Sequence, residues 1–204
     1  MKLLSSLPYI KHIEPSGDLE SDVIALLKAN DKSNTVTHSI NVSKTCVELA
    51  KRFNLDEEVA RYSGVLHNVS AFIRPVDMLN YAEKSGWYID PSERKYNFIL
   101  HQRISAIIAR EYFDIEDERI LSAIACHSTL KANASDYDMI LFLADKISWD
   151  QEGVPPFLAV LEKALETSLT HVSLEYINYV IDNNMILLPH KWLVEAKVWL
   201  EKQT

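Results

Sequence analysis

Helical spacing of apolar residues is the feature of this sequence that most constrains its fold. The chain of 204 residues contains only four glycines, and no stretch shows the strict alternation of apolar and polar residues that indicates a half-buried strand. Apolar or small residues instead recur three or four positions apart. In segment 34–53 they form one stripe: Val36, Ile40, Ser43, Val47, Ala50 and Phe53. The sequence therefore predicts an all-α fold.

Residues typical of helix starts and ends divide the chain into about ten helical segments. Ser16 or Asp18 can cap the first helix, and Pro75 and Gly86 lie at the start and just past the end of the fourth, the usual asymmetry of helix ends. The ten segments are 16–31, 34–53, 56–69, 74–86, 93–113, 116–128, 135–149, 156–168, 170–184 and 190–203. We expect one domain, 1–204, in which residues from about 20 to 150 form the functional core and residues 151–204 add C-terminal helices packed on it.

Composition excludes several classes of function. The net charge is 21 − 29 = −8, and no dense Lys/Arg block is present, which argues against a nucleic-acid partner. No run approaches the roughly 18 apolar residues of a membrane span, so we expect no membrane partner and a cytoplasmic location. Two cysteines, Cys46 and Cys126, lie in apolar helical patterns without a CxxC motif. We expect both to be small buried residues.

Four of the seven histidines stand out, together with one aspartate. His38, His67, His101 and His127 each lie on a separate predicted helix or helix end, among apolar neighbours, and Asp145 lies in a core-like helix. A single buried histidine is usually an ordinary hydrogen-bonded core residue, whereas an isolated buried aspartate is costly. Five such residues on five elements favour a metal site, because a helical bundle can bring them together. Histidine and carboxylate ligands suit iron, manganese, zinc or nickel. The other three histidines are expected at the surface or as caps: His12, His171 and His190.

The order and spacing of these residues resemble a known family. His38, His67-Asn68, His101, His127 and Asp145, within "HSINVSKTCVELAKRF", "GVLHNV", "LHQRISAIIA", "ILSAIACHST" and "FLADKI", are similar to the HD-domain metal-dependent phosphohydrolases. The closest similarity is to the bacterial branch that hydrolyses diadenosine tetraphosphate symmetrically to ADP. It covers residues from about 20 to 200 and implies an HD-domain helical bundle.

The resemblance also implies a site. In this branch a two-metal centre, often iron, would be held by the equivalents of His38, His67, Asn68 and Asp145 on one metal and of His101 and His127 on the other. The metals would activate a bound water and neutralise phosphate charge, and no side chain is assigned a catalytic role beyond that water. Relatives suggest that a homodimer can form.

Four positions depart from the family pattern. The bridging aspartate is Asn68, the lysine expected three residues later is Ala71, the arginine expected three residues before the first histidine is Thr35, and the usual Gly-Arg after the fourth histidine region is Leu130-Lys131. An amide bridges two dications less well than a carboxylate. We therefore expect at most one tightly held transition metal, with His38, His67 and Asp145 as its ligands.

Two functions remain open. The chain is either a phosphohydrolase of a nucleotide or dinucleoside polyphosphate with a weakened metal centre, or a catalytically impaired HD domain that binds nucleotide or metal in a regulatory or partner-binding role. A structural relic of the histidine cluster is the third alternative. Candidate substrate-binding residues are Lys131, Lys146 and Trp149, with Asp150 and Gln151 also expected near the pocket mouth. Trp149 can stack on a base or pack at the helix end, and Lys146 can contact phosphate or extend to solvent.

Overall fold

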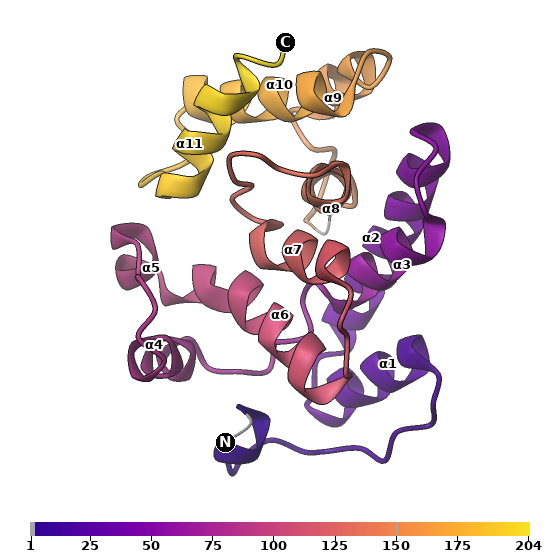
Figure 1. Ribbon diagram of the computed structural model, residues 1–204, viewed down its shortest axis with the longest axis vertical. Coiled ribbons are helices and arrows are strands. Elements are labelled where there is room, and N and C mark those ends of the chain that lie inside the picture. The colour runs from indigo at the N-terminus through magenta and orange to yellow at the C-terminus, as the bar shows by residue number, and fades with distance from the viewer. Residues whose placement is uncertain (1–2, 150) are drawn as a thin grey trace.

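A computed structural model describes residues 3–149 and 151–204 and contains only helices and loops in these ranges (Figure 1). The all-α prediction is confirmed. The α-helices are α1 (Leu19–Ala29), α2 (Ser33–Arg52), α3 (Glu57–Leu66), α4 (Pro75–Lys84), α5 (Pro91–Lys95), α6 (His101–Tyr112), α7 (Glu118–Cys126), α8 (Asp136–Ile147), α9 (Leu158–Ala164), α10 (Leu169–Asp182) and α11 (Lys191–Leu200). Two 3₁₀ turns, η1 (Leu4–Ser6) and η2 (Asn97–Leu100), complete the set.

Most helix boundaries follow the local signals. Asp18, not Ser16, caps α1, because its carboxylate accepts a hydrogen bond from the Ser21 amide at 2.8 Å. Pro75 opens α4, and Gly86 follows its end with a positive φ of 66°, a conformation that glycine adopts without strain.

The single helix expected over 93–113 is wrong. The structure divides this segment into α5, η2 and α6. The Asn97 side chain donates to the carbonyl oxygens of Glu93 and Arg94 at 2.9 and 3.0 Å, and so satisfies acceptors that a continuing helix would use. The break places His101 at the first residue of α6, where its Nδ1 lies 2.8 Å from the Phe98 carbonyl oxygen of η2.

Helix α2 packs closely against α3, on a face that differs from the predicted stripe. Ile40 and Val47 are only half-buried, whereas the buried face is Val36, Ser39, Val42, Ser43, Cys46, Leu49 and Ala50. The stripe was misplaced because serines and Cys46 line the tightest contact. A Cβ at Gly64 of α3 would lie 2.4 Å from the Ser43 Cα, so glycine permits this close approach.

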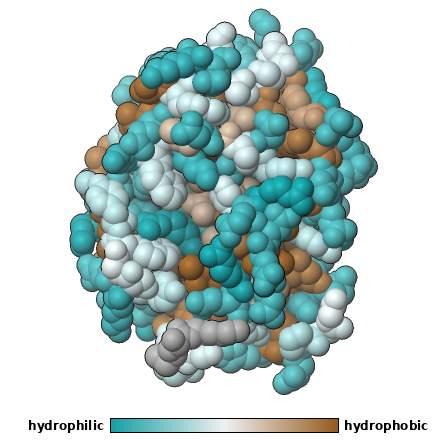
Figure 2. Space-filling view, in the orientation of Figure 1, coloured by the Kyte–Doolittle hydropathy of each residue, from teal (hydrophilic) through white to brown (hydrophobic). Residues whose placement is uncertain are grey.

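The remaining helices surround a central group formed by α6, α7 and α8 (Figure 1). The α1–α3 segment lies along one side, α4 and α5 lie along the other, and α9–α11 cover the end opposite the N-terminus. Cys46 and Cys126 are buried free thiols, as predicted. The face seen in Figure 2 is mostly hydrophilic, with hydrophobic residues in small separate patches. Among the described residues, no helix is both long and apolar enough to cross a membrane.

Candidate metal centre

Three helices bring His38, His67 and Asp145 into one cluster. His38 lies within α2, His67 is the C-cap of α3 and Asp145 lies in the last turns of α8. The Asp145 Oδ1 atom is 3.1 Å from His38 Nε2 and 3.4 Å from His67 Nε2, and the two Nε2 atoms are 3.3 Å apart. Three potential ligand atoms therefore form a nearly equilateral triangle.

The other two histidines lie beside this triangle. His101 Nε2 is 2.9 Å from His127 Nε2, and the His127 ring centroid is 5.0 Å from that of His67. His101 begins α6 and His127 is the C-cap of α7. The structure therefore brings together all five residues selected from the sequence.

Backbone carbonyls orient three of the four imidazoles. The Nδ1 atoms of His67, His101 and His127 lie 2.6, 2.8 and 2.8 Å from the carbonyl oxygens of the residue three positions earlier. A carbonyl can only accept, so each Nδ1 carries a proton, and loss of the second proton from such a ring leaves the lone pair on Nε2. Metal-binding histidines commonly have this arrangement.

The surroundings favour neutral rings at His101 and His127 and a charged carboxylate at Asp145. Burial lowers the pKa of His101 to about 4 and that of His127 well below its ordinary value, and the neighbouring histidines add to both shifts. Burial alone would raise the pKa of Asp145, but Lys146 and the hydrogen bonds with His38 and His67 outweigh it and lower that pKa well below its usual range.

These five residues fit a transition metal. Zinc–nitrogen distances of about 2.0–2.1 Å in a tetrahedral site correspond to donor atoms about 3.3–3.4 Å apart, close to the 3.1–3.4 Å of the His38–His67–Asp145 triangle. Between His101 and His127, two unprotonated nitrogens face each other at 2.9 Å. A cation between them would remove this lone-pair repulsion.

Two connected hollows open onto the cluster. The outer hollow, about 660 Å³, is lined by Asn34, Thr35, Thr37, His38, Asn41, Asn68, Ala71, Ile73, Pro75, Met78, Phe98, His101, Ser148 and Trp149. The inner hollow, about 310 Å³, is lined by His38, Asn68, His101, His127, Ser128, Asp145, Lys146, Trp149, Gln151, Phe157 and Tyr176. Asn68 borders both hollows, together with His38, His101 and Trp149.

The candidate substrate-binding residues have different surroundings. Trp149 borders both hollows, and its ring packs edge-to-face on Phe157 with centroids 5.7 Å apart. Lys146 borders the inner hollow, where its ammonium pairs with Asp145 and donates to the His127 carbonyl at 3.3 Å. Gln151 also borders the inner hollow, whereas Asp150 lies outside the described residues.

Lys131 lines neither hollow. Its ammonium donates to Ser122 Oγ at 2.7 Å and lies 3.5 Å from the buried carboxylate of Asp138. The structure therefore gives Lys131 a place different from the one expected beside substrate phosphates. The preceding Leu130 has a positive φ of 56° and is fully buried, which explains why a glycine suits this position.

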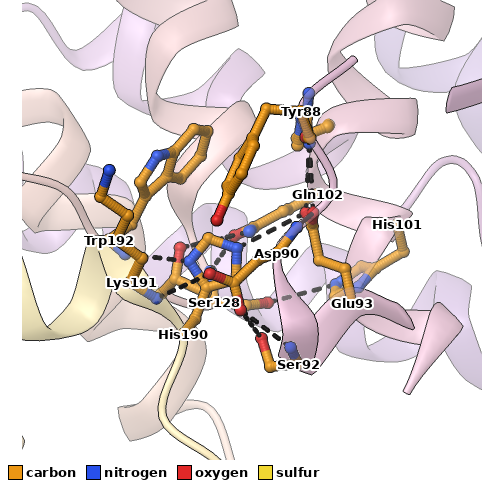
Figure 3. A network of polar contacts seen from close by, with 12 residues as sticks. Tyr88, Asp90, Ser92, Glu93, His101, Gln102, Ser128, His190, Lys191 and Trp192 are labelled. Carbon is orange, nitrogen blue, oxygen red and sulfur yellow. Dashed lines mark hydrogen bonds and ion pairs between the residues drawn. The ribbon is translucent and has the colours of Figure 1, made fainter. Parts of the chain in front are cut away.

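Gln102 is a residue that the sequence analysis missed. Its buried side chain accepts a hydrogen bond from the Ser128 amide at 3.0 Å and donates to Thr129 Oγ1 at 3.2 Å. The Ser128 hydroxyl in turn lies 3.3 Å from His101 Nε2 (Figure 3). Gln102 therefore ties the start of α6 to the end of α7. The available signal was an amide directly after His101, four residues from the apolar run that includes Ile107 and Ile108.

The polar wall of the outer hollow was also missed. Asn34, Thr37, His38 and Asn41 occupy one face of α2, and their i, i+3, i+4 and i+7 spacing could have indicated it. The sequence analysis followed only the apolar stripe of this helix.

An all-α fold with a convergent histidine–aspartate cluster defines a class of helical metal-site proteins. The chain belongs to the HD domain family, which matches residues 35–150. The resemblance expected from the sequence is thereby confirmed.

Three similar proteins extend this result. A Lactococcus lactis subsp. cremoris protein described as an uncharacterized protein in the pepC 5' region is 41% identical over 149 residues, which are 73% of this chain and 76% of that protein. The symmetrical bis(5'-nucleosyl)-tetraphosphatase of Halalkalibacterium halodurans is 25% identical over 88% of this chain and 97% of its own. A predicted HD superfamily hydrolase involved in NAD metabolism from Clostridium acetobutylicum has a TM-score of 0.79 and 26% identity, covering 90% and 97% of the two chains.

Proposed function

We propose that this protein is a metal-dependent phosphohydrolase of a nucleotide or dinucleoside polyphosphate. The observation that carries the proposal is the convergence of four histidines and Asp145 beside a hollow large enough for a nucleotide-sized ligand. The relatives named as a symmetrical tetraphosphatase and as a hydrolase involved in NAD metabolism support the same class of substrate.

The protein's own residues would hold the metal and keep its ligands oriented. His38, His67 and Asp145 would bind one divalent transition metal, and His101 and His127 offer two further nitrogens. When bound, the metal supplies Lewis acidity, which lowers the pKa of a water and neutralises phosphate charge. Lys146 keeps Asp145 ionised, and the backbone carbonyl contacts keep the three imidazoles oriented.

Asn68 supports a second candidate function. Asn68 borders both hollows, as do His38 and His101. A neutral amide offsets less of the repulsion between two dications than a carboxylate would. The second candidate is therefore an impaired HD domain that binds a metal or nucleotide without turnover.

The Asn68→Asp substitution tests these alternatives. For a hydrolase with one altered ligand, the nearly isosteric change should raise the metal content from about one to two equivalents and increase hydrolysis. If the histidine cluster binds no metal, Asn68→Asp should add an uncompensated carboxylate and lower stability by about 1–3 kcal/mol. Asn34→Asp is the matched control, since it adds the same charge to the outer hollow away from the inner one; it should not recruit metal.

Elemental analysis, a melting curve and phosphate release measured on the wild type and both variants separate the outcomes. Metal binding with no hydrolysis of any nucleotide by the wild type or Asn68→Asp would support the binding module and contradict the hydrolase.

A further inference from the structure

The outer hollow lacks ionised lysine, arginine or carboxylate side chains among the described residues that line it. One wall consists of neutral hydrogen-bonding groups of α2, including Asn34, Thr37 and Asn41. The part of the lining that α2 does not supply includes the apolar side chains of Ile73, Met78 and Phe98. Such a space can hold an uncharged nucleoside, with its hydroxyls on the polar wall and its base on these apolar side chains.

The inner hollow adds little positive charge. Its cation is Lys146, which is paired with Asp145, so their charges cancel. The net positive charge available to a substrate is therefore that of the bound metal. One divalent ion matches a phosphate monoester, which carries a charge of about −1.5 to −2 near pH 7. The further phosphates of a polyphosphate would enter the hollow without a counterion, at a desolvation cost.

We propose that the substrate carries a single phosphate group, and that the site is specific for a nucleoside monophosphate over a nucleoside or dinucleoside polyphosphate. This inference rests on the proposed hydrolase function and names its substrate class. In the reaction, the oxygen of a water forms a bond to phosphorus while the ester P–O bond breaks. The leaving oxygen takes up the proton that the water releases, and the products are a nucleoside and inorganic phosphate.

Two residues of the outer hollow can be mutated to reverse the preference for one phosphate group over several. Thr35 and Ala71 both line the outer hollow, so an arginine at the first and a lysine at the second would supply the missing cations. Gln203 is exposed near the C-terminus and lines neither hollow. Gln203→Arg is therefore a control that adds one positive charge to the protein but none to the site.

Isothermal titration with adenosine, AMP, ADP, ATP and diadenosine tetraphosphate tests the inference, on both metal-loaded and metal-free protein. We expect AMP to bind the loaded wild type most tightly, and diadenosine tetraphosphate about tenfold or more weakly, a difference of about 1.4 kcal/mol. Thr35→Arg and Ala71→Lys, made singly and together, should raise the affinity for ATP relative to AMP. Gln203→Arg should leave the order unchanged. The two single variants keep the test usable if the double variant does not fold.

Affinity that rises with the number of phosphates in the wild type would overturn the inference, as would equal binding of adenosine and AMP or no measurable binding in the series. Phosphate release from the same ligands separates this inference from the proposed function. Tight AMP binding without hydrolysis would refute the hydrolase but support the site's preference. Preferred binding and hydrolysis of diadenosine tetraphosphate would support the hydrolase and refute the preference.

Discussion

Gly64→Ala should disturb both the helix packing and the metal centre. The added Cβ would lie 2.4 Å from Ser43 Cα and 2.8 Å from Ser43 N, whereas non-bonded carbon atoms prefer about 3.5–4.0 Å. Both contacted atoms belong to the α2 backbone, so no side-chain rotation can relieve the overlap. We therefore expect α2 and α3 to separate by about 1 Å.

The free-energy cost combines two opposing effects. Overpacking of a close contact costs about 1–3 kcal/mol, and the better helix propensity of alanine offsets about 0.8–1.0 kcal/mol. Because the overlap is with backbone, we expect a net loss of stability of about 1–2 kcal/mol. The same shift should move His67, which follows α3, away from His38 on α2. In the wild type the Nε2 atoms of these two histidines are 3.3 Å apart. Metal affinity should fall about 10- to 100-fold, as for other changes in the support of metal ligands.

Gly86→Ala provides a matched glycine-to-alanine control. Nothing lies within 4 Å of a Cβ at Gly86, but its φ is +66°. This variant should lose about 1–2 kcal/mol through backbone strain and keep its metal affinity. Urea unfolding and metal titration measure both quantities. Wild-type stability and metal affinity in Gly64→Ala would refute the argument that this contact sets the spacing of His38 and His67.

Three further changes test other parts of the structure. Gln102→Leu leaves the Ser128 amide without its acceptor. This substitution should lower stability by about 1–3 kcal/mol and weaken metal binding. Unchanged urea unfolding and metal content would show that the Gln102 side chain does not hold His101 beside His127. Leu130→Gly relieves about 1–2 kcal/mol of left-handed strain but removes a buried side chain worth about 2–5 kcal/mol, so its melting temperature should fall, and a rise would contradict this balance. Burial raises the pKa of Glu93, but contacts with His190, the Asp90 amide and Arg103 outweigh this effect and lower the pKa below the ordinary 4.5. The contribution of the Glu93 carboxylate to stability is therefore present above pH 4.5 and is lost as the pH falls through the folded pKa. Wild type should therefore lose stability faster than Glu93→Gln in urea titrations below pH 4.5, and parallel losses would show that this carboxylate contributes none.

The buried network around Glu93 illustrates a limit of sequence reasoning. Glu93 is fully buried, where Arg103 lies 3.3 Å away and His190 of the α11 cap lies 3.6 Å away (Figure 3). His190 was expected to be a surface or capping residue, and it does cap α11. Its proximity to Glu93, nearly a hundred positions earlier, depends on how the C-terminal helices pack against α5 and α6.

The residue spacing determined the helical class and the five cluster residues, because helical periodicity and the cost of burying an unpaired polar group are local properties. It did not determine the buried face of α2, since small polar residues such as Ser39 and Ser43 can fill a close helix contact. The family resemblance implied a place for Lys131 beside the substrate, whereas the structure places its ammonium 3.5 Å from the buried carboxylate of Asp138.

What the tertiary structure decided is which groups face one another. His38 and Asp145 are 107 residues apart in the sequence and 3.1 Å apart in space, and the same packing leaves the outer hollow with neutral walls. The sequence determines the kind of side chain at each position. Only the crossing of the helices determines which of these side chains line the same hollow.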